Sequence, residues 1–275
     1  MSSVEVRPVT AVIGAEIRGI DLREPLTEEL RAKLEQALCD HMVLFFRDQD
    51  ITTEQQLAFG RAFGDVYCPA MARQDTEHPE IMVLDQTAPK GEGADNWHYD
   101  ATFMERPPLG AILRAVQLPS LGGDTCFANM AAAYEALSPT FQEMLAGVTA
   151  IHDLSSQLRI AIDRGISSAD YDQLRAEWPP VGHPAVRTHP VTGRKALFLN
   201  KNTGSRLEGL TDRENELLLP FLFEHVRAPE FQCRFTWEPN SIAFWDNRCV
   251  QHCGVPDYHE RRIMHRVTID GDVPY

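Results

Sequence analysis

The chain has 275 residues, of which 43% are hydrophobic and 24% charged, values that are ordinary for a globular protein. Its 26 basic and 40 acidic residues give a net charge of −14, which argues against nucleic acid and anionic membranes as partners. The first residues lack the basic and apolar regions of a signal peptide, and apolar runs such as 42–46 are too short to span a bilayer. We therefore expect a cytoplasmic protein.

Six cysteines are spread along the chain without a Cys-x-x-Cys pair, a pattern typical of reduced thiols. Cys249 and Cys253 flank His252, so a zinc site is an alternative there, but the second close pair of ligands that such sites use is missing from the sequence. No repeat or linker-like segment divides the chain, so residues 1–275 are expected to form a single domain.

Helices are expected early in the chain and in insertions. Thr27 is a good N-cap for a helix over residues 26–38, whose leucines share one face. Thr53 and Gln56 match the capping-box pattern and predict a second helix after them. Further starts are expected at Asn129 (with the helix running to Leu137), at Ser138-Pro139, and at Thr211 with Glu214 (to about Val226).

Strands dominate the remaining sequence. They are expected within residues 41–48, 109–119, 122–129, 186–200, 231–237, 241–247 and 262–270. Residues 153–182 are weakly periodic and suit either helix or mobile loop. This order, without a dinucleotide-binding or P-loop glycine pattern, favours an antiparallel barrel or jelly roll with added helices over a doubly wound α/β fold.

The stretch NWHYDATF, residues 96–103, carries a histidine and an aspartate two positions apart. Its aromatic and β-branched residues favour an extended strand, and Pro107-Pro108 opposes a helix. In a strand, His98 and Asp100 would leave the backbone on the same face, about 7 Å apart, so both tips could reach one cation. Such a pair is also common as an incidental contact, so a metal site needs a third ligand.

His252 is the best candidate for that ligand, because it follows a strand-like segment and precedes an arginine-rich one. Strands that are far apart in the sequence can be neighbours in a jelly roll, so its distance from Asp100 along the chain is no objection. Two histidines and one carboxylate on one face of an iron leave three positions open, as in non-haem Fe(II) oxygenases.

The segment HERRIMHR could supply binding groups for anions. In an extended chain Arg262 and Arg266 share a face, and a guanidinium group can bind a carboxylate through two parallel hydrogen bonds. A dicarboxylate co-substrate or an anionic substrate would suit them. Arg261 is instead expected to pair with an acidic neighbour such as Asp257 or Asp270.

Four ordered motifs resemble the taurine dioxygenase and 2,4-dichlorophenoxyacetate dioxygenase family of Fe(II)/2-oxoglutarate-dependent oxygenases. They read NWHYDATFMERPPLGAILRA, LPSLGGDTCFAN, HPVTGRKALFLN, and WDNRCVQH followed by DYHERRIMHRVTIDGD. The likeness covers almost the whole chain. It implies a mainly β protein with helices, built on a double-stranded β-helix (jelly roll) core with an N-terminal region of helices and strands and a helical insertion.

The resemblance also implies roles for the matching residues. His98, Asp100 and His252 would be catalytic and would bind Fe(II). Thr125 and Arg262 would hold the distal carboxylate of 2-oxoglutarate, the co-substrate that acts together with O2. The implied reaction hydroxylates a C–H bond next to a sulfonate, sulfate or ether group and releases succinate and CO2.

The residues implied to contact the substrate depart from those of the taurine enzyme. Arg266 would face the anionic group, as the corresponding arginine does for the sulfonate of taurine. The polar and aromatic partners of taurine are replaced here by Cys68, Met71, Ala94, Leu154 and Thr203. The substrate is therefore expected to be a small organic anion that is larger or less polar than taurine.

Two other classes of function fit the same residues. A zinc-dependent hydrolase could use two histidines and an aspartate with water as the fourth ligand. A non-catalytic, cupin-like binding protein could keep the barrel without the chemistry. Because relatives in the resembled family are often dimers or tetramers, a homo-oligomer is expected.

Overall fold

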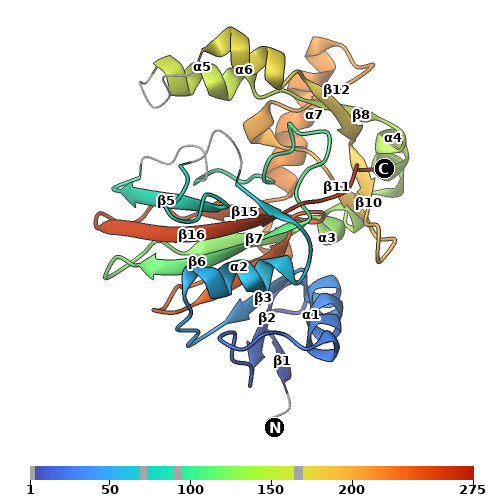
Figure 1. Ribbon diagram of the computed structural model, residues 1–275. Helices are drawn as coiled ribbons and strands as arrows, with labels where there is room; N and C mark the ends of the chain where they lie inside the picture. The colour runs from blue at the N-terminus through green and yellow to red at the C-terminus, as the bar shows by residue number, and fades with distance from the viewer. Residues whose placement is uncertain (1–3, 69–72, 90–94, 164–169) are drawn as a thin grey trace.

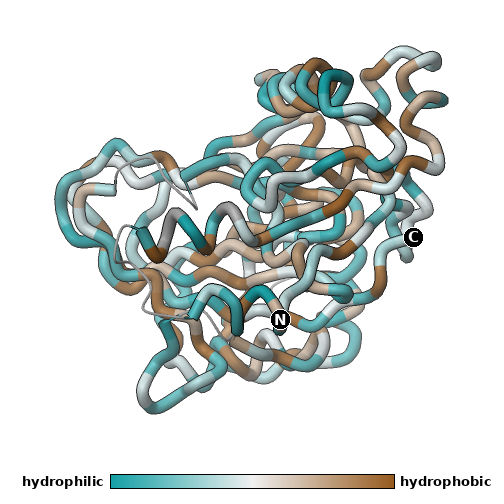
Figure 2. The backbone as a smooth tube through the Cα atoms, turned by 90° about the horizontal axis from the view of Figure 1, so that it is seen from above, coloured by the Kyte–Doolittle hydropathy of each residue, from teal (hydrophilic) through white to brown (hydrophobic). Residues whose placement is uncertain are grey.

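Two facing β-sheets form the centre of the protein, which a computed structural model describes for residues 4–68, 73–89, 95–163 and 170–275. In Figure 1 the N-terminal strands lie at the bottom and helices α5 and α6 at the top, on opposite ends of the molecule. Figure 2 shows apolar residues recurring through the inner segments and hydrophilic residues along much of the periphery.

The larger sheet has eight strands in the order β1-β2-β3-β14-β6-β16-β4, with β5 also paired to β16. All of its pairs are antiparallel except β2 with β3. Its strands in chain order are β1 (Glu5–Pro8), β2 (Ala15–Arg18), β3 (Val43–Phe46), β4 (Val66–Tyr67), β5 (Ile81–Thr87), β6 (Gly110–Gln117), β14 (Ile242–Asp246) and β16 (Arg261–Ile269).

A second sheet has three antiparallel strands in the order β13-β7-β15. These are β7 (Thr125–Asn129), β13 (Gln232–Phe235) and β15 (Val250–Gly254). Two small sheets complete the strands: β12 (Arg206–Leu207) with β8 (Thr149–His152) and β9 (Val181–Pro184), and β10 (Val186–Thr188) with β11 (Lys195–Leu197). The prediction of a mainly β protein with helices is confirmed.

The helices begin largely at the expected capping residues. Side-chain oxygens of Thr27, Asn129, Ser138 and Thr211 accept backbone N–H groups at four helix starts. The helices are α1 (Glu28–His41), α2 (Thr53–Arg61), α3 (Met130–Glu135), α4 (Pro139–Leu145), α5 (Ser155–Asp163), α6 (Tyr171–Glu177) and α7 (Asp212–His225), with short 3-10 turns η2 (Lys201–Thr203) and η3 (Pro229–Phe231). No helix in the described ranges is long and apolar enough to cross a membrane.

One capping prediction is wrong by one residue. The capping box of α2 is formed by Thr52 and Gln55, not by Thr53 and Gln56. Gln56 is fully buried, and its amide donates hydrogen bonds to backbone carbonyls of two strands of the large sheet. A buried polar side chain needs such partners, so Gln56 is not available for the cap.

The two faces of the large sheet contribute to two apolar cores. Along β3, Leu44 and Phe46 pack with residues of α1 and α2 on one side. On the other side Phe45 stacks on Phe235 of β13, with ring centroids 4.1 Å apart, and packs against Phe127 of β7. This alternation places the inner faces of both sheets against each other, where β7, β15 and β16 carry the predicted site residues.

The expected strand over residues 96–103 is not regular. His98 makes a single β-bridge, to His252, and the chain then bends, with a positive φ of 48° at Ala101. The side-chain alternation holds only locally: the hydroxyl of Tyr99 donates to the carbonyl of Leu197, while Asp100 turns toward His98. A single bridge at His98, followed by a bend, is therefore enough to bring His98 and Asp100 together.

Candidate active site

Two histidines from distant parts of the chain meet through their backbones. The amide of His98 donates to the carbonyl of His252 at 3.1 Å, and the amide of His252 donates to the carbonyl of His98 at 3.0 Å. The centroids of the two imidazole rings lie 4.3 Å apart. A reciprocal hydrogen-bonded bridge therefore sets the spacing of two predicted ligands.

The carboxylate of Asp100 completes a cluster. His98 Nε2 lies 3.9 Å from Asp100 Oδ1, and His252 Nε2 lies 3.9 Å from Asp100 Oδ2. One ligand atom from each residue lies within 4.8 Å of the others, a spacing at which the three could hold one metal ion. Each of the residues is at most 8% exposed.

The donor atoms of this cluster fit a cation. His98 Nδ1 lies 2.7 Å from the carbonyl oxygen of Asn96, which can only accept, so Nδ1 carries the proton and Nε2 keeps its lone pair. Among the described residues, the buried Asp100 Oδ2 has no hydrogen-bond partner. Buried carboxylate oxygens are normally paired, so an open oxygen beside two imidazoles suits a metal ion.

Electrostatics also keep the cluster in its metal-binding form. Burial lowers the pKa of both histidines, that of His252 to about 3, so both rings are neutral near pH 7. Burial is the largest single influence on Asp100 and by itself would raise its pKa, but the charge and hydrogen bond of Arg266 and the two neighbouring histidines together lower that pKa. Neutral imidazoles and an ionised carboxylate are the forms that bind metal.

Asn247 fixes the orientation of Asp100. Its Oδ1 accepts the amide of Asp100 at 2.9 Å, and its Nδ2 donates to the carbonyls of Asp100 at 3.0 Å and Pro108 at 3.3 Å. The residue is fully buried just after β14. This role of Asn247 was not predicted from the sequence, where the available signal was an asparagine directly after a buried apolar strand and shortly before a predicted ligand.

Arg266 is in direct contact with this cluster. Its Nη1 donates to Asp100 Oδ1 at 2.6 Å, and it is 9% exposed. Its Nε has no partner among the described residues, although it is buried. The guanidinium thus neutralises one predicted ligand and keeps a further N–H group for an anion.

Arg262 and Thr125 lie together on the same cavity, as the sequence analysis expected of a co-substrate site. Arg262 is buried with its guanidinium carbon 5.8 Å from the Trp237 ring and 6.0 Å from the Tyr258 ring. Thr125 Oγ1 accepts the indole N–H of Trp237 at 3.0 Å, so its own hydroxyl hydrogen remains available to donate. Gly123 with φ +76° leaves space for Arg262, since a Cβ there would lie 3.1 Å from Arg262 Cδ.

These groups line one cavity of about 230 Å³. Its lining includes the three predicted metal ligands, both arginines and Thr125. Apolar lining comes from Met82, Leu84 and Leu113, and further polar groups come from Gln157 of α5 and Asn202 of η2. A small organic anion with an apolar part would match this mixture.

The other expected substrate contacts lie elsewhere. Leu154 and Thr203 are buried but are not among the lining residues of the cavity, and the hydroxyl of Thr203 bonds His152 Nδ1 at 3.0 Å. Gln157 and Asn202, which lie close to them in the sequence, line it instead. The positions expected at Met71 and Ala94 fall outside the described residues.

Arg261 is paired, but not with the expected acids. It forms two hydrogen bonds with the carboxylate of Asp85 on β5, at 2.9 and 2.8 Å, instead of contacting Asp257 or Asp270. The register of β16 against β5 places Arg261 near Asp85, a pairing between strands far apart in the sequence that local spacing could not reveal.

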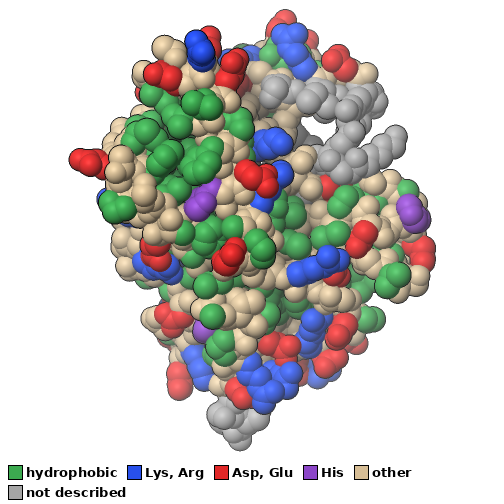
Figure 3. All heavy atoms as spheres, turned by 180° about the vertical axis from the view of Figure 1, so that it is seen from behind, with side chains coloured by type: hydrophobic (Ala, Val, Ile, Leu, Met, Phe, Trp, Pro, Cys, Tyr) green, Lys and Arg blue, Asp and Glu red, His purple; other side chains and the backbone are tan. Residues whose placement is uncertain are grey.

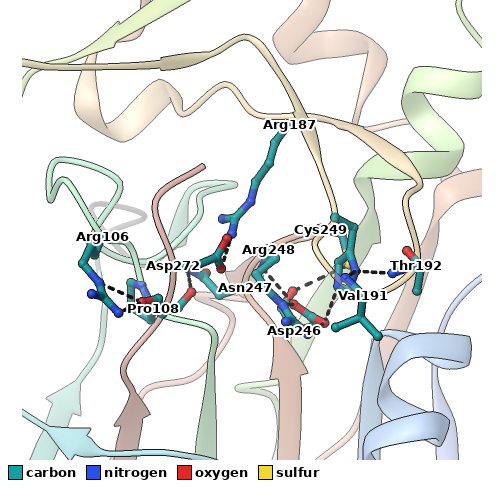
Figure 4. Close-up of polar contacts among 12 residues, drawn as sticks. Arg106, Pro108, Arg187, Val191, Thr192, Asp246, Asn247, Arg248, Cys249 and Asp272 are labelled. Carbon is teal, nitrogen blue, oxygen red and sulfur yellow. Dashed lines mark hydrogen bonds and ion pairs between the residues drawn. The ribbon is translucent and has the colours of Figure 1, made fainter. Parts of the chain in front are cut away.

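A second cluster of potential metal ligands, His189, Asp246 and Cys249, is already satisfied internally. Arg248 donates to both oxygens of Asp246, at 2.8 and 2.6 Å, and Figure 4 shows these two side chains together. His189 Nε2 lies 2.9 Å from Asp246, and its Nδ1 accepts the amide of Thr192 at 3.1 Å. These contacts stabilise the turn before β15 and leave no carboxylate oxygen open.

Residues 5–268 match the family described as taurine catabolism dioxygenase TauD, TfdA family. The chain belongs to this family. The predicted family and the prediction that the chain is an enzyme are thereby confirmed. The match spans both sheets and includes every predicted iron and 2-oxoglutarate contact.

Members of the TauD, TfdA family with known activities align along nearly the whole chain. The α-ketoglutarate-dependent sulfate ester dioxygenase of Pseudomonas putida is 35% identical over 98% of this chain and 91% of its own length. The α-ketoglutarate-dependent 2,4-dichlorophenoxyacetate dioxygenase of Cupriavidus pinatubonensis is 34% identical over 97% of both chains. α-Ketoglutarate is another name for 2-oxoglutarate.

Solved structures agree with this assignment. A taurine dioxygenase from Burkholderia xenovorans superposes with a TM-score of 0.83 at 35% identity, covering 99% of this chain and 91% of that one. AAD-2, solved in complex with Mn(II) and N-oxalylglycine, superposes with a TM-score of 0.82 at 31% identity over 99% of both chains.

Proposed function

We propose that this chain is an Fe(II)/2-oxoglutarate-dependent dioxygenase that hydroxylates a C–H bond next to a sulfonate, sulfate or ether group of a small organic anion, with release of succinate and CO2. The observation that carries the proposal is the cluster of two neutral histidines and one ionised aspartate on a cavity that also holds two buried arginines. Relatives named for sulfate esters and for 2,4-dichlorophenoxyacetate support the substrate class.

In this proposal His98, Asp100 and His252 hold Fe(II), which together with 2-oxoglutarate and O2 supplies the oxidising chemistry. The chain itself orients and shields these groups. The Asn96 carbonyl fixes the tautomer of His98. Trp245 packs against His252 with ring centroids 4.6 Å apart, which limits the access of water to that ligand.

Thr125 and Arg262 bind the distal carboxylate of 2-oxoglutarate in this proposal. The hydroxyl hydrogen of Thr125 and the guanidinium of Arg262 are both donors on one wall of the cavity. Arg262 lies among two aromatic rings and is only 8% exposed, so a carboxylate would meet little competition from water there.

Arg266 is the proposed anchor for the anionic group of the substrate. Its contact with Asp100 places the guanidinium beside the proposed iron site, so an anion held there would lie close to the reacting centre. Of the polar residues that line this cavity, Gln157 and Asn202 are nearest in sequence to the expected contacts at Leu154 and Thr203. The apolar lining favours alkyl or aryl groups over the polar amine of taurine.

Several broader features belong to the same proposal. The two facing sheets are read as a double-stranded β-helix (jelly roll) within a single domain over residues 1–275. The buried thiols of Cys233 and Cys249 suit the reducing cytoplasm, where we place the protein.

We also propose a homo-oligomer. Met144 of α4 and Leu217 and Phe221 of α7 are exposed by 41%, 74% and 46%. Apolar side chains gather at the upper left of the face shown in Figure 3. An exposed group of large apolar side chains is typical of protein contacts, so these residues are a candidate subunit interface.

Two measurements test the function. Anaerobic addition of Fe(II) and 2-oxoglutarate should produce a weak visible charge-transfer band, which His252→Ala should lack. After admission of O2, succinate release should depend on an alkyl sulfate, alkyl sulfonate or aryloxy acid more than on taurine. Absence of both the band and succinate, or hydrolysis supported by zinc without 2-oxoglutarate, would refute the proposal.

A further inference from the structure

Two cysteines face each other across the strands that carry predicted site residues. The register of β7 against β15 places Cys126 opposite Cys253. Each is next to a residue of the cavity: Cys126 follows Thr125, and Cys253 follows His252. Because successive side chains in a strand point to opposite faces, the two thiols lie on the face away from the cavity.

The backbone hydrogen bonds define how close this pair is. His252 directs its amide and carbonyl toward His98, so the neighbouring Cys253 directs its own toward β7. The same ladder has a bond from the Val255 amide to the Asp124 carbonyl at 2.9 Å, two positions further along. Cys126 and Cys253 are therefore a hydrogen-bonded pair, with Cα atoms about 5.5 Å apart, within the range of natural disulfides.

The two thiols are accessible. Both residues are partly exposed, whereas Cys233 on the neighbouring strand is buried. Arg234 lies opposite Cys126 on β13, so a guanidinium group borders the pair.

We propose that Cys126 and Cys253 form a peroxide-sensitive site, and that their oxidation to a disulfide weakens metal binding by His252. The thiolate of one cysteine attacks one oxygen of hydrogen peroxide, the O–O bond breaks, and a sulfenic acid and water form. The second thiol then displaces the hydroxyl group as water and forms the S–S bond. Overall the two sulfurs lose two electrons and two protons, and one peroxide becomes two waters.

The consequence for the metal site follows from strand geometry. Opposed Cβ atoms in such a pair lie up to about 5.5 Å apart, whereas a disulfide draws them to about 3.8 Å. Closing the bond would therefore move β15 or twist it locally by about 1 Å. His252 is the adjacent residue, and displacement of a ligand on this scale is large compared with metal–ligand tolerances. This coupling depends on the proposed ligand role of His252; the thiol chemistry does not.

The test treats the reduced protein with increasing hydrogen peroxide and follows disulfide formation by intact mass and peptide mapping. Binding of Mn(II) is titrated before and after oxidation, and again after dithiothreitol. We expect a Cys126–Cys253 cross-link and an at least tenfold loss of Mn(II) affinity that dithiothreitol reverses. Cys126→Ser and Cys253→Ser should bind Mn(II) normally when reduced and should lose this response, whereas Cys39→Ser, a change of a partly exposed cysteine on α1, should keep it.

Two results would overturn the proposal. One is oxidation of the thiols to sulfinic acids without the cross-link, and the other is a cross-link that leaves Mn(II) affinity unchanged. Neither readout needs turnover. If the enzyme fails to consume 2-oxoglutarate, that result contradicts only the proposed function. The cysteine proposal is then decided by the cross-link and by the Mn(II) affinities.

Discussion

Asn247 is expected to be the residue on which the position of Asp100 most depends. Replacing it with alanine removes three hydrogen bonds, of 2.9, 3.0 and 3.3 Å, to backbone groups in a fully buried site. A buried polar group left without a partner costs about 1–3 kcal/mol. The three backbone groups left without a partner should therefore lower the free energy of unfolding of Asn247→Ala by roughly 3–9 kcal/mol, a large part of the stability of a typical domain.

The same substitution should also weaken metal binding. Groups that orient a metal ligand typically contribute about 10–100-fold to metal affinity, so Mn(II) or anaerobic Fe(II) should bind Asn247→Ala more weakly by that factor. The matched control is Asn215→Ala. Asn215 is also buried and bonds only backbone groups, with four hydrogen bonds of 2.8 to 3.3 Å, but it connects β12 to α7.

Urea unfolding followed by circular dichroism measures the stability of both variants, and metal titration below the unfolding transition measures affinity. Both variants should be destabilised, but only Asn247→Ala should lose metal affinity. Equal affinities in the two variants would show that the orientation of Asp100 does not depend on Asn247.

Three further substitutions test the cavity and the core. Arg262→Ala should raise the KM for 2-oxoglutarate about a hundredfold or more, since a charged bidentate contact is lost. The control, Arg261→Ala on the same strand, should change this KM less than twofold. Equal effects of the two substitutions would show that Arg262 does not bind the co-substrate. Gly123→Ala should raise this KM because the added Cβ would press on Arg262. Gly147→Ala, at the same φ of +76° and with no atom within 4 Å, should only lower the stability of the protein. An equal rise in KM for both variants would contradict an effect through Arg262. Burial lowers the pKa of His152 to about 3, so the folded state resists its protonation and stability should fall by up to about 1.4 kcal/mol per pH unit as the pH drops below the unfolded value of 6.5. Urea unfolding of His152→Gln should show a shallower fall between pH 6.5 and 4, and parallel curves would contradict this.

Local signals in the sequence predicted the secondary structure well where the decisive contacts are local. Thr27, Asn129 and Thr211 cap helices because each needs only backbone N–H groups two or three residues ahead. Gln56 shows the limit of such reasoning. Its side chain bonds β6 and β16, far away in the sequence, and this tertiary demand overrides the local capping pattern.

The sequence predicted those parts of the site that depend on residue type and on the order of motifs along the chain. The spacing of His98 and Asp100 suggested two ligands, the strand-like segment before His252 made it the candidate third ligand, and the family resemblance implied the same three residues. The hydrogen bonds of Arg266 and Asn247 to Asp100 depend on where the bend after His98 lies relative to the large sheet. Residue spacing does not determine that position, so these two contacts were found only in the structure.

The charges of the cavity indicate what kind of substrate completes it. Arg262 and Arg266 are 8% and 9% exposed in a chain of net charge −14, and the Nε of each lacks a partner among the described residues. Asp100 neutralises one of them, and Asp124, which is also buried on the cavity, is paired with Arg234. Asp95 also lines the cavity and its negative charge acts on Arg262, while the two positive charges of a ferrous ion and the two negative charges of 2-oxoglutarate cancel. The Nε of Arg266 still lies buried without a partner among the described residues. Because a buried donor without a partner is costly, an anion such as a sulfate ester, sulfonate or aryloxy carboxylate fits this site better than a neutral molecule.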